Sequence, residues 1–305
     1  MKKDDVVYEI NSKGQKIGVI DLQGGLCTKL FDKKYLDFKN PVMMACSNWL
    51  TSDPVINNIE DARNIAVPDK NVFEDLGWGK NQKTIIQEFG NDMEIIGDCD
   101  SATMSYYIRF RGLERALFDL IENPELVHAV MEKGVQTSIV KGKYWLDMGI
   151  EVLRLNDSTG NMTIMSPAHW REFVYPHIKI VCDELHRYKK DCLIYCHICG
   201  NILPIAEDLV NAGFDCIAPL DPMGGFTVND IKNKVGNAVS LMGGVSTISL
   251  LQNNPHQIRK EAAECIKQSQ IYGFILGTGC VVPRDCPQEN IQSLVDASIE
   301  SSERI

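Results

Sequence analysis

The sequence predicts an α/β protein of the TIM type, a (β/α)8 barrel that is incomplete at its N-terminal end. From residue 91 onward, strand-like runs alternate with helix-like runs, which implies βαβ units and a parallel sheet. Polar and glycine-rich segments follow these strands directly, at residues 156–160, 197–200, 221–225, 243–247 and 277–280. In a barrel all of them lie at one mouth, where active sites are built. The alternative is a doubly wound open sheet, in which only loops near the switch point share a crevice.

The first ninety residues do not follow this alternation. Runs at 6–10 and 16–20 flank the turn-forming stretch Asn11-Ser-Lys-Gly14 and predict a β-hairpin. We also expect a short strand at 41–46 and short helices at 60–66 and 81–89. The chain has 305 residues, enough for one large barrel or for two smaller domains. We expect a single domain over residues 1–305, with an irregular part at 1–90 and regular βα units at 91–305.

The regular part contains six predicted strands, each recognised as a short apolar run bounded by polar or turn-forming residues. They lie at residues 93–97, 151–156, 192–196, 216–219, 238–242 and 274–276. The intervening helices are recognised by amphipathic spacing, and the second of them begins at Pro124, where proline suits the first helical turn. They lie at residues 112–122, 124–148, 167–188, 201–212, 228–234, 256–272 and 287–301.

Composition and charge restrict the class of function. The chain is 44% hydrophobic and 24% charged, as expected of a globular protein, and its net charge is −10. This charge argues against nucleic acid or an anionic membrane as the main partner, and it favours a protein partner with a basic face. No GxGxxG segment follows a strand, and no GxxxxGK[ST] segment occurs, which argues against a dinucleotide or P-loop nucleotide site.

The eleven cysteines point to thiol or metal chemistry. The N-terminus Met1-Lys-Lys-Asp-Asp5 lacks the apolar run of a signal peptide, and no apolar stretch approaches the roughly 18 residues of a membrane span. We therefore expect a cytoplasmic protein with reduced cysteines. Most of them are expected to be small core residues.

His197, Cys199 and Cys280 are the candidate metal ligands. His197 and Cys199 are at positions i and i+2 at the end of a predicted strand, so their side chains share one side, and Cys280 follows another strand. A His/Cys/Cys set leaves one of the four tetrahedral positions of Zn²⁺ open, as catalytic sites do. Two thiolates and a neutral imidazole give a complex of near-zero charge, which suits activation of a further thiol. The alternative is a buried thiol pair with a histidine bonded to backbone.

Two further cysteines lie near this set. Cys196 is expected to point to the opposite face of its strand and to serve in packing. Cys286 lies in the loop after Cys280 and is the alternative third ligand.

Several carboxylates and histidines also follow strands or lie on helices. Asp157 is a candidate for orienting substrate or for acid–base catalysis, with a turn or a helix cap as the equal alternative. Asp221 is in a similar position after a strand, and for it the turn or helix cap is the favoured interpretation. We expect Asp98 and Asp100 to be solvated. On the helix predicted at 167–188, residues 169 and 177 are histidines, and they are expected to lie on the surface or in packing contacts.

These segments resemble the uroporphyrinogen decarboxylase superfamily in order and spacing, from about residue 90 to the end. The residues that carry the resemblance are Gly112-Leu-Glu-Arg, Glu122-Asn-Pro-Glu-Leu-Val-His128, Asp157, Met165-Ser-Pro-Ala-His-Trp-Arg-Glu-Phe173 with Pro176, His197-Ile-Cys-Gly-Asn201, Gly243-Gly-Val-Ser-Thr247 and Pro287-Gln-Glu-Asn-Ile291. Decarboxylases of this superfamily need no metal and hold the carboxylates of their substrate with arginines of an N-terminal motif. That motif is absent here.

The other branch contains methylcobalamin:coenzyme M methyltransferases and their corrinoid-dependent relatives. Its members carry His-x-Cys and a late cysteine as zinc ligands, which His197, Cys199 and Cys280 match. The resemblance implies a (β/α)8 barrel whose Zn²⁺ activates a small thiol or a similar acceptor. The methyl group then moves to or from the cobalt of a corrinoid (methylcobalamin) carried by a partner protein.

One departure from the superfamily concerns the start of the barrel. The superfamily has two barrel strands before the one matched at 93–97, and this sequence shows no equivalents of them, so we expect a shortened member or a fragment. The N-terminal region or a second subunit of a homodimer would then cover the exposed sheet edges. The leading hypothesis is a zinc-dependent methyltransferase. The alternatives are a metal-free decarboxylase and a non-catalytic barrel that binds a corrinoid protein or a small ligand.

Overall fold

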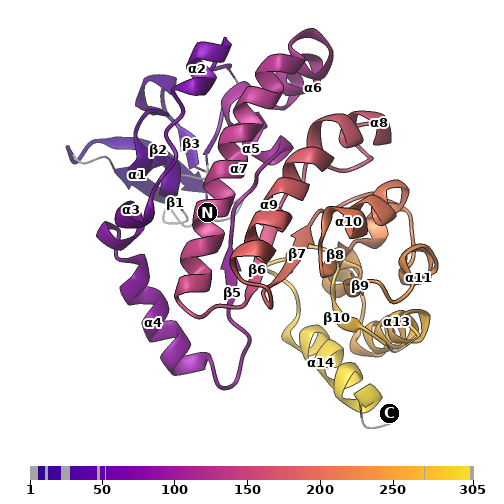
Figure 1. The fold of residues 1–305 in the computed structure, drawn as a ribbon. Coiled ribbons are helices and arrows are strands. Elements are labelled where there is room, and N and C mark those ends of the chain that lie inside the picture. The colour runs from indigo at the N-terminus through magenta and orange to yellow at the C-terminus, as the bar shows by residue number, and fades with distance from the viewer. Residues whose placement is uncertain are drawn as a thin grey trace. The chain divides into compact units, whose positions relative to one another are not determined.

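The computed structural model describes residues 6–10, 13–21, 28–46, 49–51, 53–270 and 272–302. The chain divides into two compact units. The first unit comprises residues 1–95 and 99–150, and the second comprises residues 96–98 and 151–305 (Figure 1). Both contain helices and strands, so the predicted α/β class is confirmed. The expectation of a single domain stays a prediction.

The first unit contains a four-stranded sheet in the order β1-β2-β3-β4. Strands β1 (Val6–Ile10) and β2 (Lys16–Asp21) form the predicted antiparallel hairpin, although Asn11 and Ser12 of its turn lie outside the described residues. Strand β3 (Thr28–Leu30) pairs antiparallel with β2 and parallel with β4 (Trp49–Leu50).

The strand expected at 41–46 is wrong, because these residues form helix α1 (Pro41–Cys46). Proline suits the first turn of a helix, and the Asn40 side chain accepts a hydrogen bond from the Val42 backbone N–H at 3.0 Å, as a helix N-cap does. A short apolar run such as Val42–Ala45 does not by itself distinguish strand from helix.

The described residues of the first unit contain six further α-helices. They are α2 (Ile59–Arg63), α3 (Lys70–Asp75), α4 (Trp78–Phe89), α5 (Met104–Arg111), α6 (Leu113–Glu122) and α7 (Pro124–Asp147). Among them, α5 and α7 have most of the buried residues. Helix α5 was not predicted. Residues 106–111 are all buried, so this helix has no polar face and therefore no amphipathic period to recognise. Of the helices in the described residues, none is long and apolar enough to cross a membrane.

The second unit contains a six-stranded sheet in the order β10-β9-β8-β7-β6-β5, with every neighbouring pair parallel (Figure 1). The six predicted strands are confirmed. They are β5 (Ile96–Asp98), β6 (Val152–Asn156), β7 (Leu193–His197), β8 (Cys216–Leu220), β9 (Ser240–Val245) and β10 (Phe274–Thr278). Among the described residues no pairing joins β5 to β10, so this is an open form of the predicted barrel.

Helices connect the strands of the second unit as predicted, and α12 is an additional helix that was not predicted. They are α8 (Pro167–His169), α9 (Tyr175–Tyr188), α10 (Ala206–Ala212), α11 (Val228–Val235), α12 (Thr247–Gln252), α13 (Pro255–Gln268) and α14 (Gln288–Ser302). The helix expected at 167–188 is interrupted by a π-helical stretch, Trp170–Val174. Pro176 explains this break, because it has no N–H to donate to the carbonyl four residues earlier.

The two faces of the parallel sheet differ in burial. On β7, Ile194 and Cys196 are fully buried, whereas Tyr195 and His197 are partly exposed on the opposite face. The prediction that Cys196 serves in packing is therefore confirmed. The alternation directs His197 away from this packed face, at the carboxyl end of its strand.

Candidate functional site

The structure brings His197, Cys199 and Cys280 together at the carboxyl ends of the parallel strands. His197 is the last residue of β7, and its Nε2 lies 3.5 Å from the Cys199 sulfur. Cys280 follows β10, and its sulfur lies 3.3 Å from that of Cys199, although the two cysteines are 81 residues apart in sequence. Cys199 thus contacts both other candidate ligands, and we refer to these three residues as the thiol–imidazole site.

Two glycines shape the loops that carry the cysteines. Gly200 follows Cys199 with a φ of +81°, a conformation that residues with a side chain rarely adopt. Gly279 precedes Cys280, and its backbone N–H donates to the Val245 carbonyl at 2.8 Å. The Thr278 hydroxyl donates to the Cys280 carbonyl at 2.6 Å and holds the loop from the other side. Both cysteines are therefore on backbone segments with defined turns.

Burial sets the protonation states at this site. It raises the pKa of the Cys199 thiol to about 12, and the hydrogen bond with Cys280 acts in the same direction. Burial also lowers the pKa of His197, and the positive charge of Arg154 lowers it further. Near neutral pH the imidazole is therefore neutral, the form that binds metals, and the free Cys199 thiol stays protonated.

The donor set fits a zinc ion in type and approximate spacing. Zn–S bonds of about 2.3 Å and Zn–N bonds of about 2.0 Å in a tetrahedron place two sulfurs about 3.8 Å apart and a sulfur and nitrogen about 3.5 Å apart. The observed separations are 3.3 Å for Cys199–Cys280 and 3.5 Å for Cys199–His197. Among the described residues, no group of three or more His, Cys, Asp or Glu side chains is arranged to hold a metal ion as it stands. The thiols must separate slightly to admit the ion.

Ser158 is a neighbour of the site that the sequence did not single out. Its hydroxyl lies 3.9 Å from the Cys199 sulfur and donates to the Asn156 side chain at 3.0 Å. The only indication in the sequence was its position in the polar loop after β6. A serine in such a loop is common, so this indication did not distinguish it from its neighbours.

Asp157 belongs to the same loop and is almost fully buried, at 2% exposure. Its backbone N–H donates to the His197 carbonyl at 3.0 Å, which ties this loop to the end of β7. A Cβ on Gly160 would lie 2.4 Å from the Asp157 carboxylate, so the carboxylate packs closely against this turn. A backbone hydrogen bond thus joins Asp157 to His197. The role of Asp157 in catalysis stays a prediction.

Cys286 is not brought into the site by any contact among the described residues. Its thiol donates to the Leu250 carbonyl at 3.3 Å. The two histidines predicted to be structural behave as expected. His177 is buried within α9, and His169 is partly exposed at the end of α8.

The expectation that Asp98 and Asp100 are both solvated is half wrong. Asp98 is exposed on β5 and pairs with Arg154 at 2.8 Å. Asp100 is largely buried in the first unit, where it pairs with Arg109 and with Lys141, the latter at 3.1 Å. These two partners lie 9 and 41 residues further along the chain, so sequence proximity did not reveal them.

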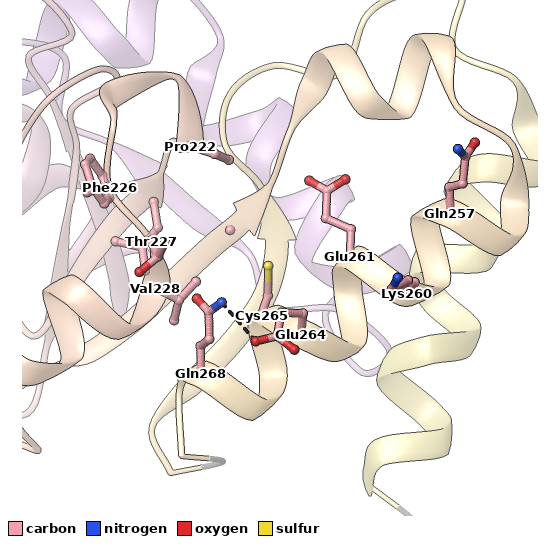
Figure 2. A pocket seen from close by; sticks show the side chains of 12 residues that line it. Pro222, Phe226, Thr227, Val228, Gln257, Lys260, Glu261, Glu264, Cys265 and Gln268 are labelled. Atoms are coloured by element: carbon pink, nitrogen blue, oxygen red, sulfur yellow. Dashed lines mark hydrogen bonds between the residues drawn. The ribbon is translucent and has the colours of Figure 1, made fainter.

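A separate pocket of about 500 Å³ lies beside α11 and α13 (Figure 2). Phe226, Val228 and Cys265 form part of its apolar lining. Two carboxylates at the pocket already accept hydrogen bonds within the protein, Glu264 from the Gln268 amide at 3.1 Å and Glu261 from the Ser246 backbone N–H at 2.7 Å. None of the three residues of the thiol–imidazole site lines this pocket. These two carboxylates are therefore less available to bind an ion than the side chains of the thiol–imidazole site.

Comparison with known proteins places this chain in a family. The family model described as "Uroporphyrinogen decarboxylase (URO-D)" matches residues 50–300, and the chain belongs to that family. Among solved structures, a methyltransferase from Methanosarcina mazei matches with a TM-score of 0.71 and 22% identity. The match covers 83% of this chain and 72% of that one, and it shows the shared fold.

The curated relatives come from both branches of the family. A methylated-thiol–coenzyme M methyltransferase of Methanosarcina mazei is 28% identical over 180 residues, 59% of this chain and 46% of the relative. The methylcobamide:CoM methyltransferase MtaA of Methanosarcina barkeri is 22% identical over 218 residues, with coverages of 72% and 61%. A uroporphyrinogen decarboxylase of Trichodesmium erythraeum is 22% identical over 179 residues, with coverages of 59% and 49%. The chain thus spans about half to three fifths of the length of these relatives.

Proposed function

We propose that the chain is a zinc-dependent methyltransferase that moves a methyl group between a corrinoid protein and a small thiol or similar acceptor. One observation carries this proposal: the Cys199 sulfur contacts both the His197 imidazole and the Cys280 sulfur at the carboxyl ends of parallel strands. In TIM-type proteins this is the edge at which active sites are built. The similarity to coenzyme M methyltransferases supports the reaction type.

His197, Cys199 and Cys280 would hold the zinc ion. Bound there, zinc supplies an open position at which an acceptor thiol is held as its nucleophilic thiolate. Burial disfavours the protonated ring of His197, and the neutral ring has one nitrogen with a lone pair available for a metal. Asp157 is proposed to orient the acceptor, since its loop is bonded to the last residue of β7. The Ser158 hydroxyl lies 3.9 Å from the Cys199 sulfur, and it would donate to a thiolate there by giving up its hydrogen bond to Asn156.

The partners and the location belong to the same proposal. The names of the coenzyme M methyltransferase relatives include a methylcobamide and a thiol, and we infer a corrinoid protein and a small thiol for this chain. The net charge of −10 favours a corrinoid protein with a basic docking face. We propose a cytoplasmic location, because thiol ligands stay reduced there, and a homodimer in which a second subunit covers the open sheet edges.

Metal analysis of the purified chain tests the proposal. We expect one zinc per chain for the wild type and strongly reduced zinc for Cys199→Ser and Cys280→Ser. Cys286→Ser is the matched control, because its thiol donates to the Leu250 carbonyl and should not affect the metal. Full zinc in both site variants would refute the zinc site.

An activity assay separates the remaining alternatives. Methylcobalamin is mixed with the protein and a series of small thiols, and the cobalt oxidation state is followed by absorbance. Demethylation that requires a thiol and is lost in Cys199→Ser supports the methyltransferase. Carboxyl loss from uroporphyrinogen without added metal would favour the decarboxylase branch, to which some of the relatives belong. Absence of both reactions in a zinc-loaded protein would favour a binding function.

A further inference from the structure

Two charged side chains lie on the same face of the parallel sheet as His197. The strand register places Asp98 of β5 beside Arg154 of β6, and Arg154 beside Tyr195 of β7. Side chains of paired residues in neighbouring strands share a face, and so do residues i and i+2 of one strand. Tyr195 comes two residues before His197, so this row lies one layer farther from the carboxyl ends of the strands. The two layers are roughly 7 Å apart along the strand.

The ion pair in this row is accessible. The Arg154 Nη2 donates to the Asp98 Oδ2 at 2.8 Å, and the side chains of Arg154 and Asp98 are 32% and 53% exposed. On the opposite face of β6, Leu153 and Leu155 are buried. The pair is therefore not part of the packed core, and it lies on the less buried face of the sheet.

The charges of this pair also act on the thiol–imidazole site. Burial is the main cause of the lowered pKa of His197, but Arg154 lowers it as well, and Asp98 opposes this effect. Because Coulomb energies decrease with distance, both charges are close to the imidazole. With bonds of about 1.5 Å, an extended chain of about five bonds spans the separation of the two layers. A short molecule can thus contact the site with one end and the ion pair with the other.

The ion pair is complementary to the head group of an α-amino acid. A guanidinium binds a carboxylate through parallel N–H donors, and an aspartate accepts hydrogen bonds from an ammonium group. A purely anionic ligand on Arg154 would bring a second negative charge beside Asp98. A purely cationic ligand on Asp98 would bring a second positive charge beside Arg154. A ligand with both charges avoids either repulsion, so the pair favours a zwitterion.

We propose that Asp98 and Arg154 are specificity-determining residues that bind an α-amino acid head group, so that the methyl acceptor is an amino-acid thiol with two methylene groups between sulfur and α-carbon. Such a thiol has five bonds from its sulfur to a carboxylate oxygen. The identity of the acceptor rests on the proposed function. The head-group site does not, because it consists of Asp98 and Arg154 and needs no metal.

The methyl transfer to this acceptor balances in atoms and electrons. The acceptor sulfur, as a thiolate, attacks the methyl carbon of the methylated corrinoid, and an S–C bond forms as the Co–C bond breaks. The electron pair of the Co–C bond stays on cobalt, which is reduced from Co(III) to Co(I). The thiol proton passes to solvent, and the product is a thioether.

The first experiment measures binding without metal. Isothermal calorimetry is performed on the full chain in the presence of a chelator, with three ligands that lack a thiol. Norleucine has the complete head group, hexanoate lacks the amine, and pentylamine lacks the carboxylate. We expect norleucine to bind to the wild type at least about tenfold more tightly than either of the others, the factor that one charged hydrogen bond provides.

Two variants should exchange this preference. Asp98→Asn removes the acceptor for the ammonium group and the competitor for Arg154, so norleucine should bind at least about tenfold more weakly and hexanoate more tightly. Arg154→Gln should weaken norleucine binding similarly and tighten the binding of pentylamine. A variant that had only lost its fold would gain affinity for neither ligand.

Arg171→Gln is the matched control for these variants. Arg171 forms an ion pair of the same kind with Asp208 on α10, at 2.9 Å. The control should therefore leave the affinities for all three ligands unchanged.

The second experiment measures turnover of the zinc-loaded protein with methylcobalamin. Homocysteine, 3-mercaptopropionate, cysteamine and 2-mercaptoethanesulfonate are compared as acceptors. We expect homocysteine to have the highest kcat/KM. Asp98→Asn should raise its KM at least about tenfold and leave kcat within a few-fold, because the residue binds the head group and not the reacting sulfur.

The outcomes separate the head-group site from the proposed function. If the wild type methylates no thiol but prefers norleucine, and the variants exchange this preference, the methyltransferase fails and the head-group site stands. If norleucine binds to the wild type no more tightly than hexanoate and pentylamine, or if both variants keep the wild-type affinity for norleucine, the head-group site is overturned. Preference of the wild type for 2-mercaptoethanesulfonate over homocysteine would overturn the amino-acid acceptor and leave the methyltransferase intact.

Discussion

Two clusters of polar side chains, one in each unit, are built on opposite principles. In the first unit, the fully buried Asp119 accepts hydrogen bonds from Arg111, Arg115, Tyr107 and Asn123 at 2.7–3.1 Å. In the second unit, the contacts of the Cys199 sulfur with described residues are long, at 3.3–3.9 Å. The first cluster has opposite charges that satisfy one another. The second consists of two thiol groups and an imidazole in weak sulfur contacts, and its side chains can therefore bind an ion. A cluster of polar residues thus indicates a binding function only where its side chains are not already fully hydrogen-bonded to one another.

The largest expected effect tests the satisfied cluster. Asp119→Ala leaves the Arg111 guanidinium, which is nearly buried, without its counter-charge. Breaking a buried ion pair on one side costs about 3–5 kcal/mol in the free energy of unfolding. Urea denaturation followed by circular dichroism measures this loss. Glu122→Ala is the control, because its pair with Arg115 is exposed and contributes only about 0–1 kcal/mol. Equal effects of the two substitutions would contradict the comparison.

The stability that the Asp119 cluster provides should also depend on pH. Burial alone would raise the pKa of Asp119, but the hydrogen bonds from Arg111, Tyr107 and Arg115 outweigh it and lower the pKa from 3.8 to about 2. A carboxylate with a lowered pKa in the folded state stabilises the fold above its unfolded pKa. This contribution is therefore complete above about pH 4 and is lost as the pH falls through about 2. Urea titrations across this range should show a smaller acid-dependent loss for Asp119→Asn than for the wild type.

A smaller effect is expected where a thiol of the second unit is part of the core. Cys196 is fully buried, and its thiol donates a weak hydrogen bond to the Ala218 carbonyl at 3.9 Å. Cys196→Ser places a hydroxyl in an apolar environment, which costs about 1–3 kcal/mol. Zinc content per folded chain should stay at the wild-type value. Loss of zinc together with unchanged stability would show that Cys196, and not only Cys199, binds the ion.

Much of the second unit was predictable from the sequence, because its fold follows local rules. The alternation of apolar runs with amphipathic segments identified all six parallel strands, and the i, i+2 spacing placed His197 and Cys199 on one side. Cys280 was identified because it also follows a strand. The hydrogen bond from the Gly200 backbone N–H to the Asp221 carboxylate was not predicted, because it depends on which strands are neighbours in the sheet and on tight approaches of glycine backbone.

The first unit was less predictable for a physical reason. Helix α5 is buried on almost all sides, so its sequence lacks the alternation of apolar and polar faces by which a helix is recognised. Asp100 was expected to be a solvated loop residue. It is instead largely buried, and Arg109 and Lys141 compensate its charge. Helix α1 was taken for a strand because a six-residue apolar run contains no period that distinguishes the two. Non-local partners decided the first two cases, whereas α1 is favoured by the local Asn40 cap and by Pro41.

The smallest effect on stability is expected at the thiol–imidazole site. Cys199→Ser should change the free energy of unfolding of the metal-free protein by less than about 1 kcal/mol, because the residue is partly exposed and weak sulfur contacts contribute little. The same substitution should abolish the stabilisation that added zinc gives to the wild type, since ligand binding stabilises only a fold that binds it. Thermal denaturation with and without zinc measures both quantities, and Cys286→Ser serves as the control. A zinc-dependent rise in Tm that persists in Cys199→Ser would mean that the ion binds elsewhere. A decrease of several kcal/mol in the free energy of unfolding without metal would mean that Cys199, like Asp119, makes strong bonds within the protein.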